Sequence, residues 1–362
     1  MKTLKIIALL ALMPGCADAQ STTAETNLDI TGDSLPAISH IVEMKMSSDT
    51  LLFVYESNDG YGQRFLRRAF IDFGSNQLKT SPDVGKRDDG YYVSFMPYPV
   101  IADNGTIRVI SQDDGEIYSI ENDTSLVRTK HYLMDGNSTV PFPLSRYVKD
   151  IFMSDSDQYV FMGREPNGGR QFAMAADLTS SKIDTIRQIN ISPELQTWMP
   201  NTGEMAYSRK HRRLAFAYRL HPVIEIFRLD GSVLTSVEVA KPTFDPATLD
   251  EADFEDMNPL HFVDITTTDD YIYALYWGHT SRQHQAHDAK STIYKVDWDG
   301  NIVARYPVNS VLKGIAAYND NILIGWTGNN FVKIPAGRDA IYRVRIEKWY
   351  VLMCGIYNTE NQ

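Results

Sequence analysis

A short phrase that recurs along the chain limits its possible folds most strongly. The segment 293–306 has a run of β-forming residues, an Asp299-Gly300 turn and a second such run; the segment 224–237 repeats this pattern and 116–129 follows it more loosely. An aspartate and glycine pair between two such runs is the sequence signal of a β-hairpin. Hairpins that recur along a long chain are typical of a β-propeller, whose blades are small antiparallel sheets.

The pattern continues through the chain after its first residues. We find about six copies at a spacing on the order of 50 residues, which suits a four-stranded blade with its loops. The copies begin near Ile41, Tyr98, Val148, Glu204, Phe262 and Lys313. Helix-forming patterns are almost absent, and no segment rich in glycine, serine or proline divides residues 20–362. The sequence therefore predicts an all-β fold in one domain, a six-bladed β-propeller of four-stranded antiparallel blades.

Closing such a ring requires one more strand in the last blade, because an open ring exposes a strand edge. Two apolar segments are candidates for that strand. One is the N-terminal segment 28–30 and the other is the C-terminal segment 349–357. The sequence leaves both alternatives open.

Residues 1–19 have the composition of a secretory signal peptide. A basic start is followed by the apolar stretch 6–13, which is too short to span a bilayer. Two processing sites compete: a lipobox ending at Cys16, where the cysteine would carry a lipid, and ordinary cleavage after Ala19. With the lipid we expect an exported lipoprotein at the outer membrane or facing the periplasm. Without it we expect a soluble periplasmic or secreted protein.

The formal net charge of −11 bears on the partners. An acidic protein is a poor match for nucleic acid and for anionic lipid surfaces, so we expect neither as a partner. No later stretch has the apolar length of a transmembrane helix, so attachment to a membrane is expected only through a lipid on Cys16. The other cysteine is Cys354, so a mature chain with Cys16 lipidated or removed forms no internal disulfide.

The leader, the repeated hairpins and the phrase at 293–300 together resemble those of the TolB-like six-bladed propeller lipoproteins of Gram-negative bacteria. The resemblance extends over nearly all of the mature chain. It implies an exported, lipid-anchored propeller of no established activity, and it supplies no catalytic residues. It does not imply a role in the Tol system, because a shared fold does not confer a shared function.

The lengths of the connections indicate where a ligand binds. In a four-stranded blade the first-to-second and third-to-fourth turns lie on one face of the disc, here the short-turn face; examples are 103–105 and 268–270. The second-to-third and blade-to-blade connections lie on the other face and are longer, as at 240–260 and 278–291. Long loops on a rigid ring usually carry the binding residues. We therefore predict a ligand site on this long-loop face, at the mouth of the central channel.

Basic and aromatic residues near this mouth are the candidates for contact with a ligand. They are Tyr92, Tyr98, Lys149, Trp198, Arg219, Trp277 and Lys313. Aromatic rings stack on sugars and peptides, although most rings in a propeller pack between blades. We expect a binding or scaffolding module without a cofactor, whose partner is a peptide, a glycan or an envelope protein of unknown identity.

An enzyme is the alternative. Polar residues fall on or beside the inner strands that would line the channel: Glu43, Lys45, Lys149, Asp150, Glu204, His261, Asp264 and Lys313. Carboxylates and a histidine from this set, namely Glu204, His261 and Asp264, could perform metal-dependent hydrolase or lyase chemistry. The simpler interpretation is that these strands face a watery channel and are polar for that reason.

A histidine-rich loop is the weak candidate for a metal site. His279, His284 and His287 lie within ten residues, and neutral imidazoles at short spacing can share one transition-metal ion. The loop has to turn before these rings can meet, and the sequence does not require that turn. The alternative is a solvated loop between strands, which we favour.

Overall fold

The structure is a computed structural model, and it describes most of the chain between Thr23 and residue 337. The described residues are 23–32, 35, 38–57, 63–85, 97–102, 104–111, 116–121, 124–131, 149–165, 169–180, 182–249, 254–285 and 289–337. Cys16, Tyr92, His287, Cys354 and the segment 349–357 lie outside these residues, so the predictions made for them stay predictions.

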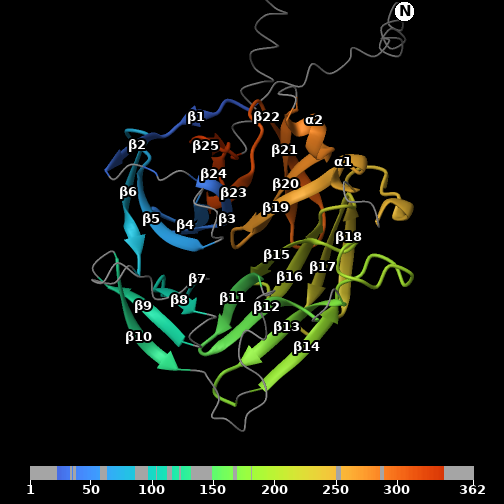
Figure 1. The fold of residues 1–362 in the computed structure, drawn as a ribbon, viewed down its shortest axis with the longest axis horizontal. Helices are drawn as coiled ribbons and strands as arrows, with labels where there is room; N and C mark the ends of the chain where they lie inside the picture. Colours follow the sequence, from blue (N-terminus) through green and yellow to red (C-terminus); the bar gives the residue numbers. More distant parts are fainter. Residues whose placement is uncertain are drawn as a thin grey trace, which may run out of the picture.

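Six antiparallel sheets form a ring around a central axis (Figure 1). Blade 1 consists of β3 (Ile38–Ser47), β4 (Thr50–Ser57), β5 (Arg64–Asp72) and β6 (Gln77–Val84). Blade 2 consists of β7 (Pro97–Ile101), β8 (Ile107–Ser111), β9 (Glu116–Glu121) and β10 (Ser125–His131). Blade 3 consists of β11 (Lys149–Asp155), β12 (Gln158–Arg164), β13 (Gln171–Asp177) and β14 (Lys182–Gln188).

The second half of the ring repeats this arrangement. Blade 4 consists of β15 (Gly203–Ser208), β16 (Arg213–Tyr218), β17 (Val223–Arg228) and β18 (Val233–Glu238). Blade 5 consists of β19 (Leu260–Thr267), β20 (Tyr271–His279), β21 (Ser291–Asp297) and β22 (Ile302–Val308). Blade 6 consists of β23 (Gly314–Asn319), β24 (Ile322–Trp326) and β25 (Phe331–Pro335), completed by β1 (Thr26–Asn27). The predicted six-bladed propeller is confirmed.

The N-terminal segment closes the ring. In β1, Thr26 pairs with Lys333 and Asn27 with Val332, and the Leu28 N–H donates to the Phe331 carbonyl over 3.0 Å. The chain then continues as β2 (Asp29–Gly32), which lies parallel to β6 and makes blade 1 five-stranded. Of the two segments considered for closure, the N-terminal one therefore supplies the strand, one or two residues earlier than 28–30.

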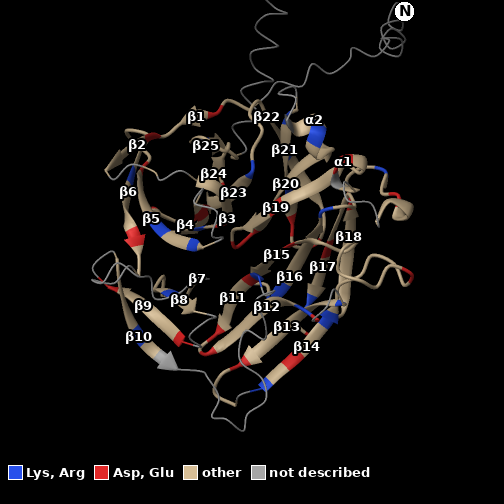
Figure 2. Ribbon diagram, in the orientation of Figure 1, with Lys and Arg blue, Asp and Glu red and all other residues tan. Residues whose placement is uncertain are grey.

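An apolar cluster fills each of the six interfaces between neighbouring blades. Because a middle strand has a neighbouring blade against both of its faces, its sequence can be apolar continuously instead of in alternation. Residues 51–55 of β4 and 214–218 of β16 are such runs, and all of their side chains are buried. The outermost strands face water: β14 mixes basic and acidic residues along its length in Figure 2.

The Asp-Gly turns that define the repeat also hold neighbouring blades together. Gly231 and Gly300 have φ of +83° and +91°, in the left-handed region that glycine adopts without strain. A Cβ at Gly231 would lie 2.2 Å from the Ile186 carbonyl oxygen, and one at Gly300 would lie 2.5 Å from a methyl carbon of Thr235. Both neighbours belong to the outer strand of the preceding blade. Glycine therefore permits the turn and the close approach of the next blade.

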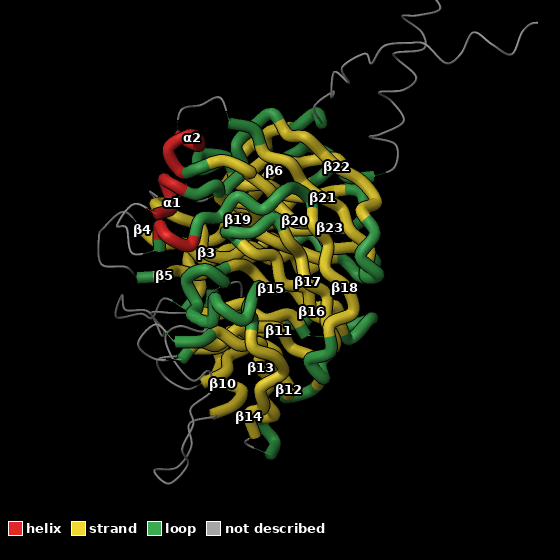
Figure 3. The backbone as a smooth tube through the Cα atoms, turned by 90° about the vertical axis from the view of Figure 1, so that its right-hand side faces the viewer, coloured by secondary structure: helices red, strands yellow, loops and turns green. Residues whose placement is uncertain are grey.

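The two faces of the disc differ as the sequence predicts. Short helices α1 (Phe254–Met257) and α2 (Ser281–Gln285) lie in long connections, and Figure 3 shows them together on one side of the disc. The structure also has a 3-10 turn at Pro246–Thr248 in the connection from blade 4 to blade 5. This side is the long-loop face.

We predict that Gly231→Ala destabilises the fold more than Gly105→Ala. Gly105 also has a positive φ, +77°, but a Cβ there would meet nothing within 4 Å. The substitution Gly105→Ala therefore measures the cost of backbone strain alone. We expect a loss of about 1–2 kcal/mol in the free energy of unfolding for Gly105→Ala and an additional loss of about 1–3 kcal/mol for Gly231→Ala. Urea denaturation measures both. Equal losses would contradict a role for Gly231 in blade packing.

Candidate functional site

Among the described strands, the innermost strand of every blade has one edge without a strand beside it, and these edges face the central channel. The inner strands are β3, β7, β11, β15, β19 and β23. A cavity of about 270 Å³ lies in this channel. Its charged lining residues are Glu43, Lys45, Asp150, Glu204, Arg209, Asp264 and Asp269.

Two of the cations bridge neighbouring inner strands through backbone carbonyls. The Lys45 Nζ donates to the carbonyls of Pro99 and Ile151, each over 2.9 Å, and lies 2.6 Å from Glu43 Oε1. These three acceptors match the three N–H groups of an ammonium. Lys45 of blade 1 is therefore fastened to blades 2 and 3.

Arg209 makes a similar bridge from blade 4. Its Nη2 donates to the Met153 carbonyl over 2.8 Å and to the Ile101 carbonyl over 3.3 Å. Arg209 follows β15 directly, in the turn to the next strand. Its reach to the inner strands of two other blades leaves no local pattern in the sequence, so sequence reasoning misses it.

Whereas these cations donate to backbone carbonyls, two carboxyl groups accept hydrogen bonds from backbone N–H groups. Asp150 Oδ2 accepts from the Met205 N–H over 2.8 Å, which links blade 3 to blade 4. Asp264 Oδ2 accepts from the Ile315 N–H over 2.7 Å, which links blade 5 to blade 6, and its Oδ1 accepts from the Ile265 N–H over 2.8 Å.

Burial changes the acidity of both carboxyl groups. It raises the pKa of Asp264 to about 8, although the two backbone N–H donors oppose the change. Burial also raises the pKa of Asp150 well above its ordinary value, against the attraction of Lys149. Asp150 further has a φ of +52°, a strained backbone conformation for a residue with a side chain. Asp150 and Asp264 are therefore buried carboxyl groups whose burial costs free energy. Each accepts a hydrogen bond from the backbone of the next blade.

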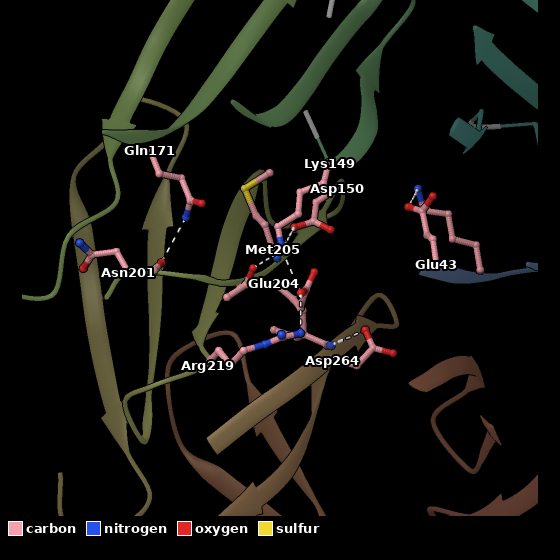
Figure 4. Close-up of polar contacts among 12 residues, drawn as sticks. Glu43, Lys149, Asp150, Gln171, Asn201, Glu204, Met205, Arg219 and Asp264 are labelled. Carbon is pink, nitrogen blue, oxygen red and sulfur yellow. Dashed lines mark hydrogen bonds and ion pairs between the residues drawn. The ribbon is translucent and has the colours of Figure 1, made fainter. Parts of the chain in front are cut away.

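A second group of charges lies where the inner strands begin, at the long-loop mouth of the channel. Lys149 Nζ lies 2.8 Å from Glu204 Oε1, and it also donates to the Gly203 carbonyl. Arg219 follows β16, and its Nη2 lies 3.8 Å from the same Glu204 oxygen. Figure 4 shows both cationic side chains directed toward Glu204. Lys313 precedes β23 and is exposed.

Trp277 forms an aromatic wall beside Lys313. Its Nε1 donates to the Leu312 carbonyl over 2.8 Å, and the His284 ring stacks on it with ring centres 3.5 Å apart. Burial lowers the pKa of His284 to about 4, helped by His279 and Lys313. At neutral pH this ring is therefore uncharged and stacks as an aromatic group.

The structure brings two of the three candidate metal ligands together. His279 Nε2 and His284 Nδ1 are 3.4 Å apart, and His279 Nδ1 lies 2.8 Å from the Trp277 carbonyl. Among the described residues no group of three or more histidine, cysteine, aspartate or glutamate side chains is placed to hold a metal ion. The His279 and His284 rings lie together because both stack with the Trp277 ring.

Two other residues predicted to contact a ligand have partners within the fold. Tyr98 is 5% exposed and belongs to the apolar cluster between blades 2 and 3, so it lies in the core. Trp198 lies in the connection between blades 3 and 4, where the Arg164 guanidinium covers its ring at 3.8 Å.

The three residues proposed for catalysis do not form one site in the described structure. Glu204 and Asp264 line the cavity, but His261 does not. His261 is 2% exposed, and its two ring nitrogens lie 3.2 Å from the Tyr276 hydroxyl and 3.3 Å from the Thr243 hydroxyl. In the part of the chain that the structure describes, this histidine is a buried packing residue.

Comparison with known proteins agrees with the fold. A family model described as TolB-like 6-blade propeller-like matches residues 182–320, from β14 to β23. With the six blades of the structure, this match confirms the resemblance to TolB-like six-bladed propellers; the lipid anchor stays a prediction. No curated protein matches the sequence.

Solved structures share the fold at low sequence identity. A member of the DUF4221 family from Bacteroides vulgatus is 12% identical with a TM-score of 0.51, covering 87% of this chain and 98% of that one. A protein of unknown function from Bacteroides thetaiotaomicron is 9% identical with a TM-score of 0.50, covering 86% and 75%. A virginiamycin B lyase from Staphylococcus aureus is 14% identical, covers 82% and 80%, and has a TM-score of 0.41, which is too low to support an argument. These likenesses show the fold alone.

The described part of the chain has no helix that is long and apolar enough to cross a membrane.

We predict that Asp264 makes the stability of the protein depend on pH. Because its folded-state pKa is raised to about 8, folding favours the protonated form, and the contribution of this group falls as the pH rises from about 4 to about 8. Relative to the wild type, Asp264→Asn should gain up to about 1.4 kcal/mol of unfolding free energy per pH unit in this range. Urea denaturation at several pH values measures the difference.

The matched control is Asp184→Asn on the outer strand β14, whose side chain is 56% exposed. It should follow the wild type across the same pH range. A pH dependence in Asp264→Asn identical to that of the wild type would contradict the raised pKa.

Proposed function

Since the chain resembles TolB-like six-bladed propellers over residues 182–320, we propose that it is a binding or scaffolding module of the cell envelope and not an enzyme. Its ligand, a peptide, a glycan or a partner protein, binds on the long-loop face at the mouth of the central channel. A lipid on Cys16 anchors the exported protein to the membrane.

One observation carries the proposal: the ionisable side chains inside the channel are largely buried, whereas the cationic side chains at the mouth are at least partly exposed. Lys45 and Asp264 both have backbone partners on neighbouring strands. Lys313 is exposed beside the Trp277 stack, and the Lys149 and Arg219 side chains are 35% and 32% exposed. A rigid scaffold with charged and aromatic groups at one opening is suited to recognition.

The location of the ligand can be tested by hydrogen exchange. Peptides and glycans prepared from bacterial envelopes are screened for thermal stabilisation of the purified mature protein, and each hit is footprinted by amide exchange. We expect protection at the long-loop mouth, in segments 219–222, 277–280 and 326–330. Protection confined to the short-turn face, at 47–50 and 268–271, would contradict the proposal.

The anchor is tested by cell fractionation. Cys16→Ser should move the protein from the membrane fraction to the soluble fraction, because a lipidated cysteine is the expected attachment. Cys354→Ser is the matched control and should stay with the membrane. Unchanged membrane association of Cys16→Ser would contradict lipidation at this residue.

A further inference from the structure

The outer strand of blade 5 begins with two apolar side chains that face solvent. β22 starts just after an Asp-Gly turn, and its first two residues, Ile302 and Val303, are 36% and 42% exposed. On blade 4, β18 starts after the equivalent turn with Val233, which is 40% exposed. The turn at Gly300 packs on Thr235 of β18, so the three apolar residues lie at the short-turn end of two neighbouring outer strands. We call these three residues the rim patch.

Other outer strands begin with polar residues at this position. β14 of blade 3 begins with Lys182, whose side chain is 66% exposed, and β10 of blade 2 begins with Ser125, which is also exposed. A single exposed apolar residue is ordinary on a protein surface, whereas apolar residues gathered on adjoining strands indicate a contact surface. β22 is also the last strand of its sheet among the described strands, and an exposed apolar edge strand is prone to association.

The N-terminal strap, residues 23–32, begins on the same outer strand. Thr23 forms a parallel bridge with Val308 at the far end of β22, and its N–H donates to a β22 carbonyl over 2.7 Å. Glu25 Oε1 accepts from the Ser310 N–H over 3.0 Å, and β1 then pairs with β25 of blade 6. The start of the strap is therefore fastened to the rim of blade 5.

The length of chain between Cys16 and the strap places a lipid on Cys16 within reach of the rim patch. Cys16 precedes Thr23 by seven residues, and a chain of this length spans at most about 25 Å. β22 is about 20 Å long, with Thr23 beside one end and Ile302 at the other. At Thr23 the chain runs parallel to β22, in the direction from Ile302 to Val308. A bilayer that holds this lipid is therefore close enough to touch the rim patch.

The charges beside the rim patch favour an electrically neutral partner. Asp299 pairs with Arg213 at 2.9 Å. Hydrogen bonds from Ser232, and then the charge of Arg228, lower the pKa of Asp230. The two acidic and two basic groups balance each other, and the formal net charge of −11 opposes binding to anionic lipid.

We propose that the rim patch rests on the neutral lipid surface of the membrane that holds the Cys16 anchor. The propeller then stands with the rim of blades 4 and 5 toward the bilayer, where apolar side chains enter the interface between headgroups and acyl chains. This inference rests on the anchor in the proposed function and adds the surface by which the ring meets the membrane. The long-loop face, at the other end of these strands, stays accessible to a ligand.

Fluorescence quenching on vesicles tests the contact. The lipidated mature protein is reconstituted in phosphatidylcholine vesicles that contain a spin-labelled lipid, which quenches fluorophores close to the bilayer. A fluorophore is attached to Val303→Cys or, as the matched control, to Val127→Cys, each in a Cys354→Ser background. Both valines are 42% exposed, and their strands β22 and β10 lie on opposite sides of the ring (Figure 1). We expect at least about twofold stronger quenching at Val303→Cys, because interfacial contact buries it in the headgroup region.

A second variant separates contact by the side chains from closeness to the tether. Val233→Asp with Ile302→Asp, both at exposed positions, should lower the quenching at Val303→Cys to the level of Val127→Cys while the protein stays with the vesicles. Equal quenching at the two labelled positions, or unchanged quenching in the double aspartate variant, would overturn the inference and leave the anchor standing. A dimer that shields the Val303→Cys label without lipid would also overturn it, in favour of a second copy of the chain. Failure of the full mature protein to bind the vesicles would overturn both the anchor and the inference.

Discussion

The stability of the ring depends on hydrogen-bond partners for the backbone groups along the channel-facing edges of the inner strands. Each blade ends at the axis in a strand with a neighbour on one side only, and unpaired backbone groups in a partly buried channel are costly. Ionisable side chains from other blades occupy some of these positions. Lys45 and Arg209 donate hydrogen bonds to carbonyls of β7 and β11, and Asp264 accepts one from an N–H of β23. The inner strands are thereby joined across blades that share no strand pairing.

This constraint divides the polar residues of the channel into two groups. Side chains in the interior are bound to backbone, and their burial is tolerated because they replace strand pairing. Side chains at the long-loop mouth are more exposed and also pair with each other, as Lys149 and Arg219 do around Glu204, although Lys149 additionally donates to the Gly203 carbonyl. A channel that looks rich in catalytic groups is thus mostly structural in the described part of the chain, and we propose its opening as the place of recognition.

The sequence predicts the architecture well because the signal is periodic and local. Asp-Gly turns recur, the second strands β4 and β16 contain continuous apolar runs, and a glycine at position 231 or 300 is required both by its own φ and by the neighbouring blade. The site is predicted less well, because it depends on contacts between residues far apart in the chain. Lys45 reaches Ile151, 106 residues away, and Arg209 reaches Ile101, 108 residues away. His261 shows the same dependence: its position on an inner strand suggests chemistry, and its ring lies between Thr243 and Tyr276, a packing contact that no local pattern predicts.

The most direct test of this account is the stability of Lys45→Met, which keeps most of the side-chain length and removes the ammonium. If Lys45 joins three blades, the variant leaves two carbonyls and Glu43 without their donor, and the free energy of unfolding should fall by about 3 kcal/mol or more in urea denaturation. Lys182→Met on the exposed outer strand should change it by less than about 0.5 kcal/mol. A change in Lys45→Met as small as that in Lys182→Met would contradict the claim that channel charges hold the ring together.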